Sequence, residues 1–399
     1  MKSDYEARHD LPDEPAESGT LDEEFVGKSR STLRFSRYLL LCILVLVLAI
    51  TLMTNSDSIN LDNFRRMWHK LDFGPESAVS SPAFAADSMA VSYKDGVAIL
   101  TPSVLRILDN AGREFMNVTT GFTSPALLTD NRYTVAYDRS GTKLIVTNSF
   151  SVVAEKNMPE TISYVTVSED HYLSVITSGN GYKNSLYVYN DDFEEIFVWH
   201  SNDRYLLNAC VSPDEKTVSA VCYNIKDGAD TPEFVGIHLD EEQISWSVTL
   251  EGLPLDMCYK SASNIALLHS DHVDFYSGNG KLSNTYVFEK NFLQAYVLDA
   301  DRTLLVLSGS KRGESTLYSV SDRGKASVIA ELTDTVQRID ENGGRAALLG
   351  EKSIQIVSLM SNRVLYERAG DSAIQDICFA GKNTLLDIYS TYCVYNELD

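Results

Sequence analysis

The segment from His269 to Asp274 (HSDHVD) carries the densest group of side chains that can bind a metal ion. Imidazole nitrogens and carboxylate oxygens are ligands for zinc and other divalent transition metals. Neighbouring side chains of a β-strand point to opposite faces, so His272 and Asp274 face one side while Asp271 faces the other. On this pattern no three ligands converge, and the sequence favours a polar hairpin turn without a metal.

Two acidic turns, Asp138-Arg-Ser-Gly141 and Asp191-Asp192, are weaker candidates for calcium. A calcium site needs about six to eight oxygen ligands, and the chain has no D-x-[DN]-x-[DN]-G run to supply them. The chain also lacks a G-x-S-x-G elbow, a P-loop and a G-x-G-x-x-G fingerprint. We therefore predict no catalytic, cofactor-binding or metal-binding residue, no cofactor and no enzymatic activity.

The cysteines indicate structural thiols. Cys42 lies in an apolar run, and the other five lie inside apolar, strand-like patterns such as DICFA, where buried free thiols are expected: Cys210, Cys222, Cys258, Cys378 and Cys393. The sequence cannot assign a pairing among them, so a disulfide stays open as the alternative.

The run from Tyr38 to Met53 contains no charge, no Gly and no Pro. As a helix it would extend roughly 24 Å, slightly less than the ~30 Å hydrocarbon core of a bilayer, and Thr54 lengthens it. We predict a transmembrane helix over residues 38–54. The alternative is a helix buried on every side in the core of a soluble domain.

Basic residues on the N-terminal side of this run set the expected orientation. Lys28, Arg30, Arg34 and Arg37 precede it with no acid among residues 28–37, and the positive-inside rule places such a flank in the cytoplasm. A cleaved signal peptide is the rival interpretation, but the run begins late and no Ala-x-Ala-like site follows it. We predict an uncleaved signal anchor in the cell membrane, with the C-terminal bulk outside the cytoplasm.

Charge separates the segments around this anchor. Residues 1–27 contain nine acids against Lys2 and Arg8, so residues 1–37 are predicted to be an acidic, disordered cytoplasmic tail with a basic flank. The formal net charge of the whole chain is −22. Because nucleic-acid binding depends on Lys and Arg, this charge argues against a nucleic-acid partner.

Residues 55–88 are predicted to be a stalk and linker. Apolar residues recur at helical spacing in 55–72, which predicts a short amphipathic helix next to the bilayer or packed on the following domain. Residues 74–88 are small and rich in Pro and Ser, as expected of a linker.

From Met89 onward, short apolar runs alternate with Gly, Asp, Asn and Ser turns, the pattern of an all-β fold. The runs group into units of four strands that recur about every 36–48 residues, as in the blades of a β-propeller. The turns between first and second strands include the type I sequences Ser168-Glu-Asp170 and Asp299-Ala-Asp301. We predict a β-propeller over 89–399, with eight blades favoured and seven as the alternative.

The eighth unit contains only three strands, IQDICF, TLLDIY and YCVYNE. We predict that residues 81–86 supply its fourth strand and so close the ring. A row of β-sandwich domains is the competing architecture, but an immunoglobulin-like Cys–Trp–Cys pattern is missing. A quinone cofactor is disfavoured because the domain has only Trp199 and Trp246, both in outer-strand positions.

Several turn-and-strand motifs resemble an uncharacterised bacterial family of single-pass membrane proteins with a propeller-like (WD40- or quinoprotein-like) domain. The motifs are Asp95-Gly-Val-Ala-Ile-Leu-Thr-Pro-Ser103, Asp109-Asn-Ala-Gly112, Ser124-Pro-Ala and Tyr137-Asp-Arg-Ser-Gly141. The resemblance covers most of residues 60–399 and implies a transmembrane segment before the repeats. Because these motifs are structural, it implies no catalytic or binding residue.

Two functions are compatible with the sequence. The favoured one is a non-enzymatic scaffold, tethered to the membrane, that binds a protein partner at the cell surface. The alternative is a sensor or enzyme that binds a small molecule or glycan in the central channel, an argument from fold alone. Converging carboxylates or histidines in the channel would favour the second hypothesis, and a lining of Val, Ser and Ala would oppose it.

Overall fold

The computed structural model of the protein describes residues 36–49, 61–72, 84 and 87–398, apart from 131, 180, 227–228, 242 and 310. Most of the predicted tail, residues 50–54 of the predicted span and much of the predicted stalk and linker lie outside these residues. The chain divides into two compact units, Met1–Phe64 and Arg65–Asp399.

In the first unit, residues 36–49 form a helix whose side chains are all exposed. Leu40, Leu44 and Leu48, for example, expose 68%, 65% and 58% of their surface. Among the described residues, no helix combines the length and the apolar character needed to cross a bilayer. The transmembrane helix over 38–54 therefore stays a prediction.

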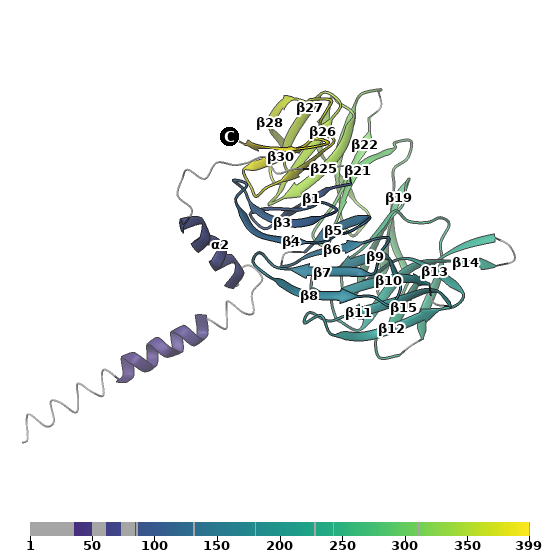
Figure 1. Cartoon of the computed structure of the whole chain (residues 1–399). Coiled ribbons are helices and arrows are strands. Elements are labelled where there is room, and N and C mark those ends of the chain that lie inside the picture. The colour runs from purple at the N-terminus through teal and green to yellow at the C-terminus, as the bar shows by residue number, and fades with distance from the viewer. Residues whose placement is uncertain are drawn as a thin grey trace, which may run out of the picture. The chain divides into compact units, whose positions relative to one another are not determined.

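The second unit contains eight antiparallel sheets that follow one another along the chain (Figure 1). Among the described residues the first seven sheets have four strands and the eighth has three, and each strand pairs with the next one in sequence. The all-β propeller with eight blades is confirmed, and each repeat unit identified in the sequence corresponds to one sheet.

The strands of the first four blades are, in chain order, β1 (Met89–Tyr93), β2 (Gly96–Leu100), β3 (Val104–Asp109), β4 (Glu114–Thr119), β5 (Pro125–Thr129), β6 (Thr134–Asp138), β7 (Lys143–Thr147), β8 (Val152–Asn157), β9 (Thr161–Val167), β10 (Leu173–Gly179), β11 (Tyr182–Tyr189), β12 (Glu195–Ser201), β13 (Arg204–Val211), β14 (Thr217–Lys226), β15 (Ala229–His238) and β16 (Ile244–Thr249). Those of the last four are β17 (Asp256–Ser261), β18 (Asn264–Leu268), β19 (His272–Ser277), β20 (Leu282–Val287), β21 (Leu293–Leu298), β22 (Thr303–Ser308), β23 (Ser315–Val320), β24 (Ala326–Leu332), β25 (Val336–Asn342), β26 (Arg345–Gly350), β27 (Ser353–Ser358), β28 (Arg363–Ala369), β29 (Asp376–Phe379), β30 (Thr384–Ile388) and β31 (Cys393–Glu397).

The place of a strand within its blade decides its burial. Strand β2 is buried along its whole length, whereas the fourth strand β20 alternates between exposed and half-buried residues. A sheet that is covered on both faces needs apolar side chains on both, while an outer strand meets water. This difference explains why second strands such as GVAIL are continuous apolar runs and fourth strands alternate.

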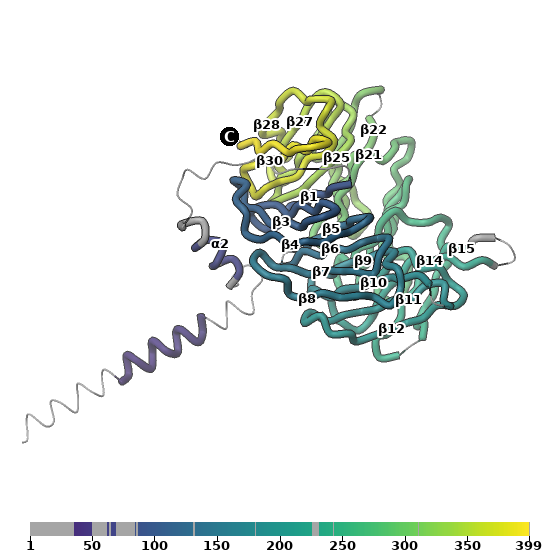
Figure 2. Tube along the Cα trace, viewed as in Figure 1, coloured from purple at the N-terminus to yellow at the C-terminus, as the bar shows by residue number. Residues whose placement is uncertain are grey.

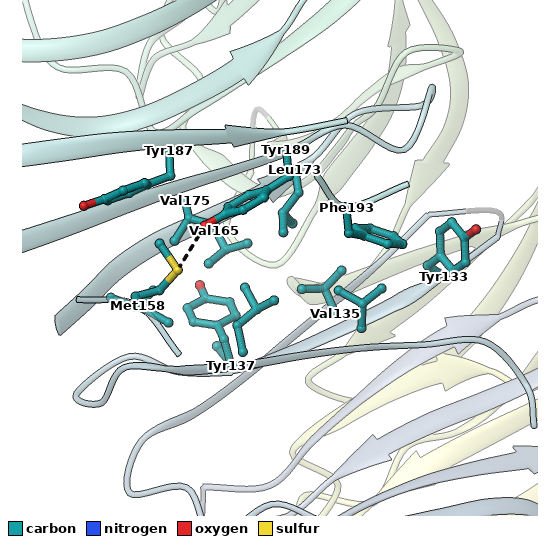
Figure 3. Close-up of a cluster of buried hydrophobic side chains, with 14 residues drawn as sticks. Tyr133, Val135, Tyr137, Met158, Val165, Leu173, Val175, Tyr187, Tyr189 and Phe193 are labelled. Carbon is teal, nitrogen blue, oxygen red and sulfur yellow. Dashed lines mark hydrogen bonds between the residues drawn. The ribbon is translucent and has the colours of Figure 1, made fainter. Parts of the chain in front are cut away.

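Apolar side chains fill the space between neighbouring blades. The described residues form eight buried clusters, and each cluster joins two adjacent blades. Figure 3 shows the cluster between the second and third blades, to which β6 contributes Tyr137 and β10 contributes Val175. There the hydroxyl of Tyr189 donates a hydrogen bond to the Sδ atom of Met158 at 3.5 Å.

One of these clusters closes the ring. Val97 and Ile99 of the first blade pack with Cys378, Leu386 and Cys393 of the last blade. The two blades, blue and yellow in Figures 1 and 2, lie side by side although they stand at opposite ends of the domain's sequence. With both faces of every sheet covered, the ring is closed by side-chain packing.

Phe84 is the one described residue of the segment predicted to complete the last blade. Its backbone N–H donates to the carbonyl oxygen of Thr391 at 3.1 Å, just before β31, and its ring packs on the closure cluster. The remaining residues of 81–86 lie outside the described ones, so a full fourth strand stays a prediction.

Helix α2 (Leu61–Asp72) falls within the predicted amphipathic segment, and its Arg66 is buried against the propeller. The Arg66 guanidinium donates from Nε to Asp95 Oδ1 at 2.8 Å and from Nη1 to Ser149 Oγ at 2.9 Å. It also lies 4.4 Å from the ring centre of Phe115, a cation–π contact. These contacts favour the interpretation in which the helix packs on the domain.

Truncation of a closure residue is expected to destabilise the whole ring. Ile99→Ala should lower the free energy of unfolding by about 2–5 kcal/mol, because it removes buried methyl groups and leaves a cavity. Urea denaturation followed by circular dichroism measures this loss. The control Leu365→Ala changes a half-exposed side chain on β28 and should cost less than about 0.5 kcal/mol. Equal losses in the two variants would contradict a closure role for Ile99.

Candidate functional site

The first strands of the eight blades surround a central channel. Their side chains and first turns line a cavity of about 890 Å³. Each blade starts on its innermost strand, so turns such as those at Glu169 and at Asp299–Asp301 meet at one end of the channel. We call this the first-turn end.

Acidic side chains are frequent in the channel lining. Seven carboxylate residues line it, against three cationic residues. The acids are Asp130, Glu169, Asp299, Asp301, Asp340, Glu341 and Asp376, and the cations are Lys94, Arg302 and Arg338. The lining thus differs from the inert Val, Ser and Ala surface that would have opposed ligand binding.

Four of these acids, Glu169, Asp299, Asp301 and Glu341, form what we call the acidic mouth at the first-turn end. Burial raises the pKa of Glu169, and the carboxylates of Asp301 and Asp299 raise it further. Acids from the third and sixth blades therefore act on one another across the channel. Such like-charge crowding favours the binding of a cationic group.

Hydrogen bonds fix the acidic mouth from beneath. The Asp299 carboxylate accepts the backbone N–H of Arg302 at 2.7 Å, and the Glu341 carboxylate accepts that of Gly344 at 2.9 Å. The Arg302 guanidinium lies 3.4 Å from the Glu341 carboxylate. The ammonium of Lys260 donates to the backbone carbonyl of Asp299, and burial lowers the pKa of Lys260. The carboxylates are thus held on short, tight turns.

Asp340 lies deeper in the channel and connects the seventh and eighth blades. One of its carboxylate oxygens accepts the backbone N–H of Phe379 at 2.6 Å. Burial raises the pKa of Asp340 to about 7, and the neighbouring Asp376 carboxylate acts in the same direction. Burial also raises the pKa of Asp376 itself. The inner part of the channel can therefore gain or lose protons near neutral pH.

Three thiols on innermost strands, those of Cys210, Cys258 and Cys378, also line the channel. Each lies within 3.3–3.6 Å of the carbonyl oxygen of the next residue. Burial raises the pKa of Cys210 to about 12 and that of Cys378 well above its usual value. Since the thiolate is the reactive form, these groups are not activated nucleophiles. Cys210, Cys378 and Cys393 are buried cysteines outside any disulfide, as expected of structural thiols, and Cys258 is a half-buried one.

The two acidic turns considered as calcium candidates, at Asp138 and at Asp191–Asp192, do not line the channel. The two carboxylate oxygens of Asp138 accept the backbone N–H groups of Thr123 and Ser124 at 2.9 and 2.8 Å. Asp138 therefore fixes the connection between the first and second blades. Asp191 and Asp192 lie on an exposed turn. The two tryptophans of the propeller occupy fourth strands as predicted, Trp199 on β12 and Trp246 on β16.

The sequence interpretation of His269–Asp274 was wrong on one point. Ligand atoms of His269, His272 and Asp274 lie within 4.8 Å of one another, so three metal-binding side chains do converge. Residues 269 and 272 flank a two-residue turn, and residues that face each other across such a turn share a face. The sequence interpretation considered only the alternation of side chains along one strand, and it therefore did not include His269, which lies across the turn.

The acidic mouth was not recognised from the sequence as a site. Its turns, Ser168-Glu-Asp170 and Asp299-Ala-Asp301, were identified only as type I turns. Their positions in the repeat could have indicated the site, since each turn connects the first and second strands of its unit. Superposing the units would have placed both acidic turns at one end of the ring.

An eight-bladed β-propeller with an acidic channel mouth is the class of protein that this fold and site define. The chain belongs to a family of unknown function, DUF5711, whose model matches residues 78–394. The resemblance to an uncharacterised family with a propeller-like domain is thus confirmed, while its bacterial and single-pass character stays a prediction. A comparison with curated proteins finds no match.

Solved propellers share the fold. Chaetomium thermophilum Sqt1, bound to the N-terminus of the ribosomal protein L10, is 12% identical with a TM-score of 0.50, covering 79% of this chain and 97% of its own. A eukaryotic initiation factor is also 12% identical with a TM-score of 0.50, covering 83% and 92%. At such identity the likeness shows the fold alone.

The raised pKa of Asp340 predicts a specific pH dependence of stability. Between about pH 4 and 7 the folded chain keeps a proton that the unfolded chain releases, so stability falls as pH rises through this range. Asp340→Asn should remove this contribution and raise the free energy of unfolding at pH 8 by about 1 kcal/mol or more, with little change at pH 4. Urea titrations at both pH values measure it.

The matched control Asp322→Asn makes the same charge change at an exposed position and should not reproduce the gain in stability at pH 8. Some slope should persist in Asp340→Asn, because burial also raises the pKa of Asp256, to about 6. If Asp340→Asn were less stable than the wild type at pH 8, its carboxylate would be a stabilising charge and the argument would fail.

Proposed function

We propose that this protein is a membrane-anchored, extracytoplasmic β-propeller that binds a protein partner through the acidic mouth and has no catalytic role. The apolar run over 38–54 and the basic flank before it support the anchor and its orientation. The exposed apolar side chains of the helix at 36–49 support it too, since so much apolar surface is favourable in lipid and unfavourable in water.

The acidic mouth is the observation that carries the binding proposal. Glu169 and Asp301 are exposed, and both stand on tight turns of a closed ring. A preorganised cluster of like charge attracts a complementary segment and limits the entropy lost on binding. The expected partner is therefore a protein with a Lys- or Arg-rich segment. The related fold of Sqt1, solved with the N-terminus of a ribosomal protein bound, is a parallel case of a propeller that binds a protein segment.

The absence of an activated nucleophile among the channel thiols supports a binding role. The thiols of Cys210 and Cys378 have raised pKa values, as described above. The carboxylates of Glu341 and Asp340 accept the backbone N–H groups of Gly344 and Phe379. This arrangement suits recognition of positive charge.

Neutralising the acidic mouth should reduce partner capture. In cross-linking of the full-length protein in its host, followed by mass spectrometry, the double variant Glu169→Gln, Asp301→Asn should lose most of the captured partner. The charge-matched control Glu251→Gln, Glu351→Gln changes exposed acids at the end opposite the first turns. It should capture as much as the wild type. Equal capture by both double variants would exclude the acidic mouth as the binding surface.

The anchor is tested separately. The full-length protein should resist extraction of the membrane fraction by alkaline carbonate, whereas Leu44→Arg, Leu46→Arg should be released, because each Arg near the centre of a span costs about 2.5–3.5 kcal/mol. Leu44→Val, Leu46→Val is the control and should stay membrane-bound. Release of the wild-type protein would refute the anchor.

The orientation has its own measurement. A membrane-impermeant amine reagent applied to intact cells should label the exposed Lys281 and Lys325 of the propeller. Labelling of these lysines only after lysis would reverse the proposed topology.

One observation favours a second candidate function, the binding of a small cationic molecule in the channel. Asp340 lines the same cavity as the four acids of the mouth, and this cavity is large enough for such a ligand. Calorimetric titration with a diamine distinguishes this candidate from protein binding. Saturable binding that Asp340→Asn weakens would favour a small-molecule sensor.

A further inference from the structure

We propose that His269, His272 and Asp274, on the hairpin between β18 and β19, form a binding site for a divalent transition-metal ion such as Zn²⁺. The site lies on the second turn of the fifth blade, at the end of the ring opposite the acidic mouth. It is independent of the function proposed above.

The turn geometry brings the three side chains together. The backbone N–H of His269 donates to the carbonyl oxygen of His272 at 2.8 Å, which closes a two-residue turn with the two histidines as its flanking pair. Their rings stack with centres 4.1 Å apart and planes 8° from parallel. Asp274 lies two residues beyond His272 on the same face, and its Oδ2 atom is 3.6 Å from His272 Nε2.

The second observation concerns His269 itself. Its side chain is almost wholly buried, with the residue 4% exposed, and its Nε2 atom has no hydrogen-bond partner among the described residues. Buried polar atoms are nearly always satisfied, so an unpaired nitrogen beside two further ligands needs an explanation. A metal ion bound to this nitrogen would provide one.

The charges around His269 suit a cation. The carboxylates of Asp271 and Asp274 lie 2.7 and 3.6 Å from the ring nitrogens of His272. A metal ion binds the lone pair of an imidazole nitrogen, and the buried Nε2 atom of His269 has no hydrogen-bond partner that would compete for it among the described residues. The Asp274 carboxylate supplies the negative charge.

Outer partners orient two of the ligands. The Nδ1 atom of His272 lies 2.7 Å from Asp271 Oδ1, which leaves Nε2 as the coordinating nitrogen. The hydroxyl of Thr285 donates to Asp274 Oδ1 at 2.5 Å. Asp274 Oδ2 accepts a long hydrogen bond from the Tyr276 hydroxyl at 3.4 Å and lies 3.6 Å from His272 Nε2. A carboxylate behind a metal-binding histidine is the usual support of such sites.

Binding requires a small rearrangement. Two ligand atoms on a tetrahedral zinc with bonds of about 2.0–2.1 Å are roughly 3.3 Å apart. The ligand atoms of His269, His272 and Asp274 lie within 4.8 Å of one another, so they must move closer to bind the ion. The His272 side chain is 23% exposed, so it is the ligand that must move to bring these atoms closer, and it gives the ion access. Three protein ligands leave a fourth position for water.

Calorimetric titration of the full-length protein, stripped with a chelator, tests the site with Zn²⁺ alone. One saturable site is expected, and Co²⁺ in its place should give the visible absorption of a tetrahedral complex. His272→Gln and Asp274→Asn should each weaken Zn²⁺ binding by more than roughly ten-fold, since loss even of outer-shell partners costs about 10–100-fold. The exposed His238 provides the control His238→Gln, which should bind as the wild type does.

Circular dichroism of the metal-free variants separates lost binding from lost structure, because both substitutions roughly keep the size of the side chain. Asp271→Asn adds a graded test, with a smaller loss of affinity than either ligand variant. The proposal is overturned if the wild-type protein shows no saturable Zn²⁺ binding, or if His272→Gln and Asp274→Asn bind as tightly as His238→Gln.

Discussion

Packing between the first and last blades is the constraint on which this structure depends. Each sheet is apolar on both faces, so a blade is stable only when neighbours cover both. Seven of the eight interfaces join blades that are adjacent in sequence. The eighth joins Val97 and Ile99 to Leu386 and Cys393, and without it two apolar faces would meet water. Closure also positions the channel, because the innermost strands surround a common space only in a complete ring.

The closed ring holds acidic side chains close together in the channel. Acids from the third, sixth and seventh blades are held close together although their mutual repulsion and burial raise the pKa values of Glu169, Asp340 and Glu341. A flexible surface would relax by moving such carboxylates apart. Here backbone N–H groups hold the carboxylates of Asp340 and Glu341 and oppose that relaxation. The unfavourable electrostatic energy is offset by the packing between blades, and it is available to favour a cationic ligand.

Much of the fold could be predicted from the sequence, because strand period and turn chemistry are local. The eight units, the three-stranded last unit and the outer-strand positions of Trp199 and Trp246 all correspond to the structure. The acidic mouth could not be predicted in the same way, since Glu169 and Asp301 meet only through ring geometry. The metal candidate shows a related limit, because alternation was applied along β19 and the partner His269 lies across the turn.

Ring closure also has a consequence for synthesis of the chain on the ribosome. Ile99 emerges early, yet its packing partner Leu386 is made about 290 residues later. At about 5–20 residues per second this delay lasts on the order of 15–60 s, during which one apolar face of the first blade has no native cover. A chaperone, or early packing of other chain segments, must protect that face. The slowest and most aggregation-prone stage of folding is therefore expected just before the last blade is complete.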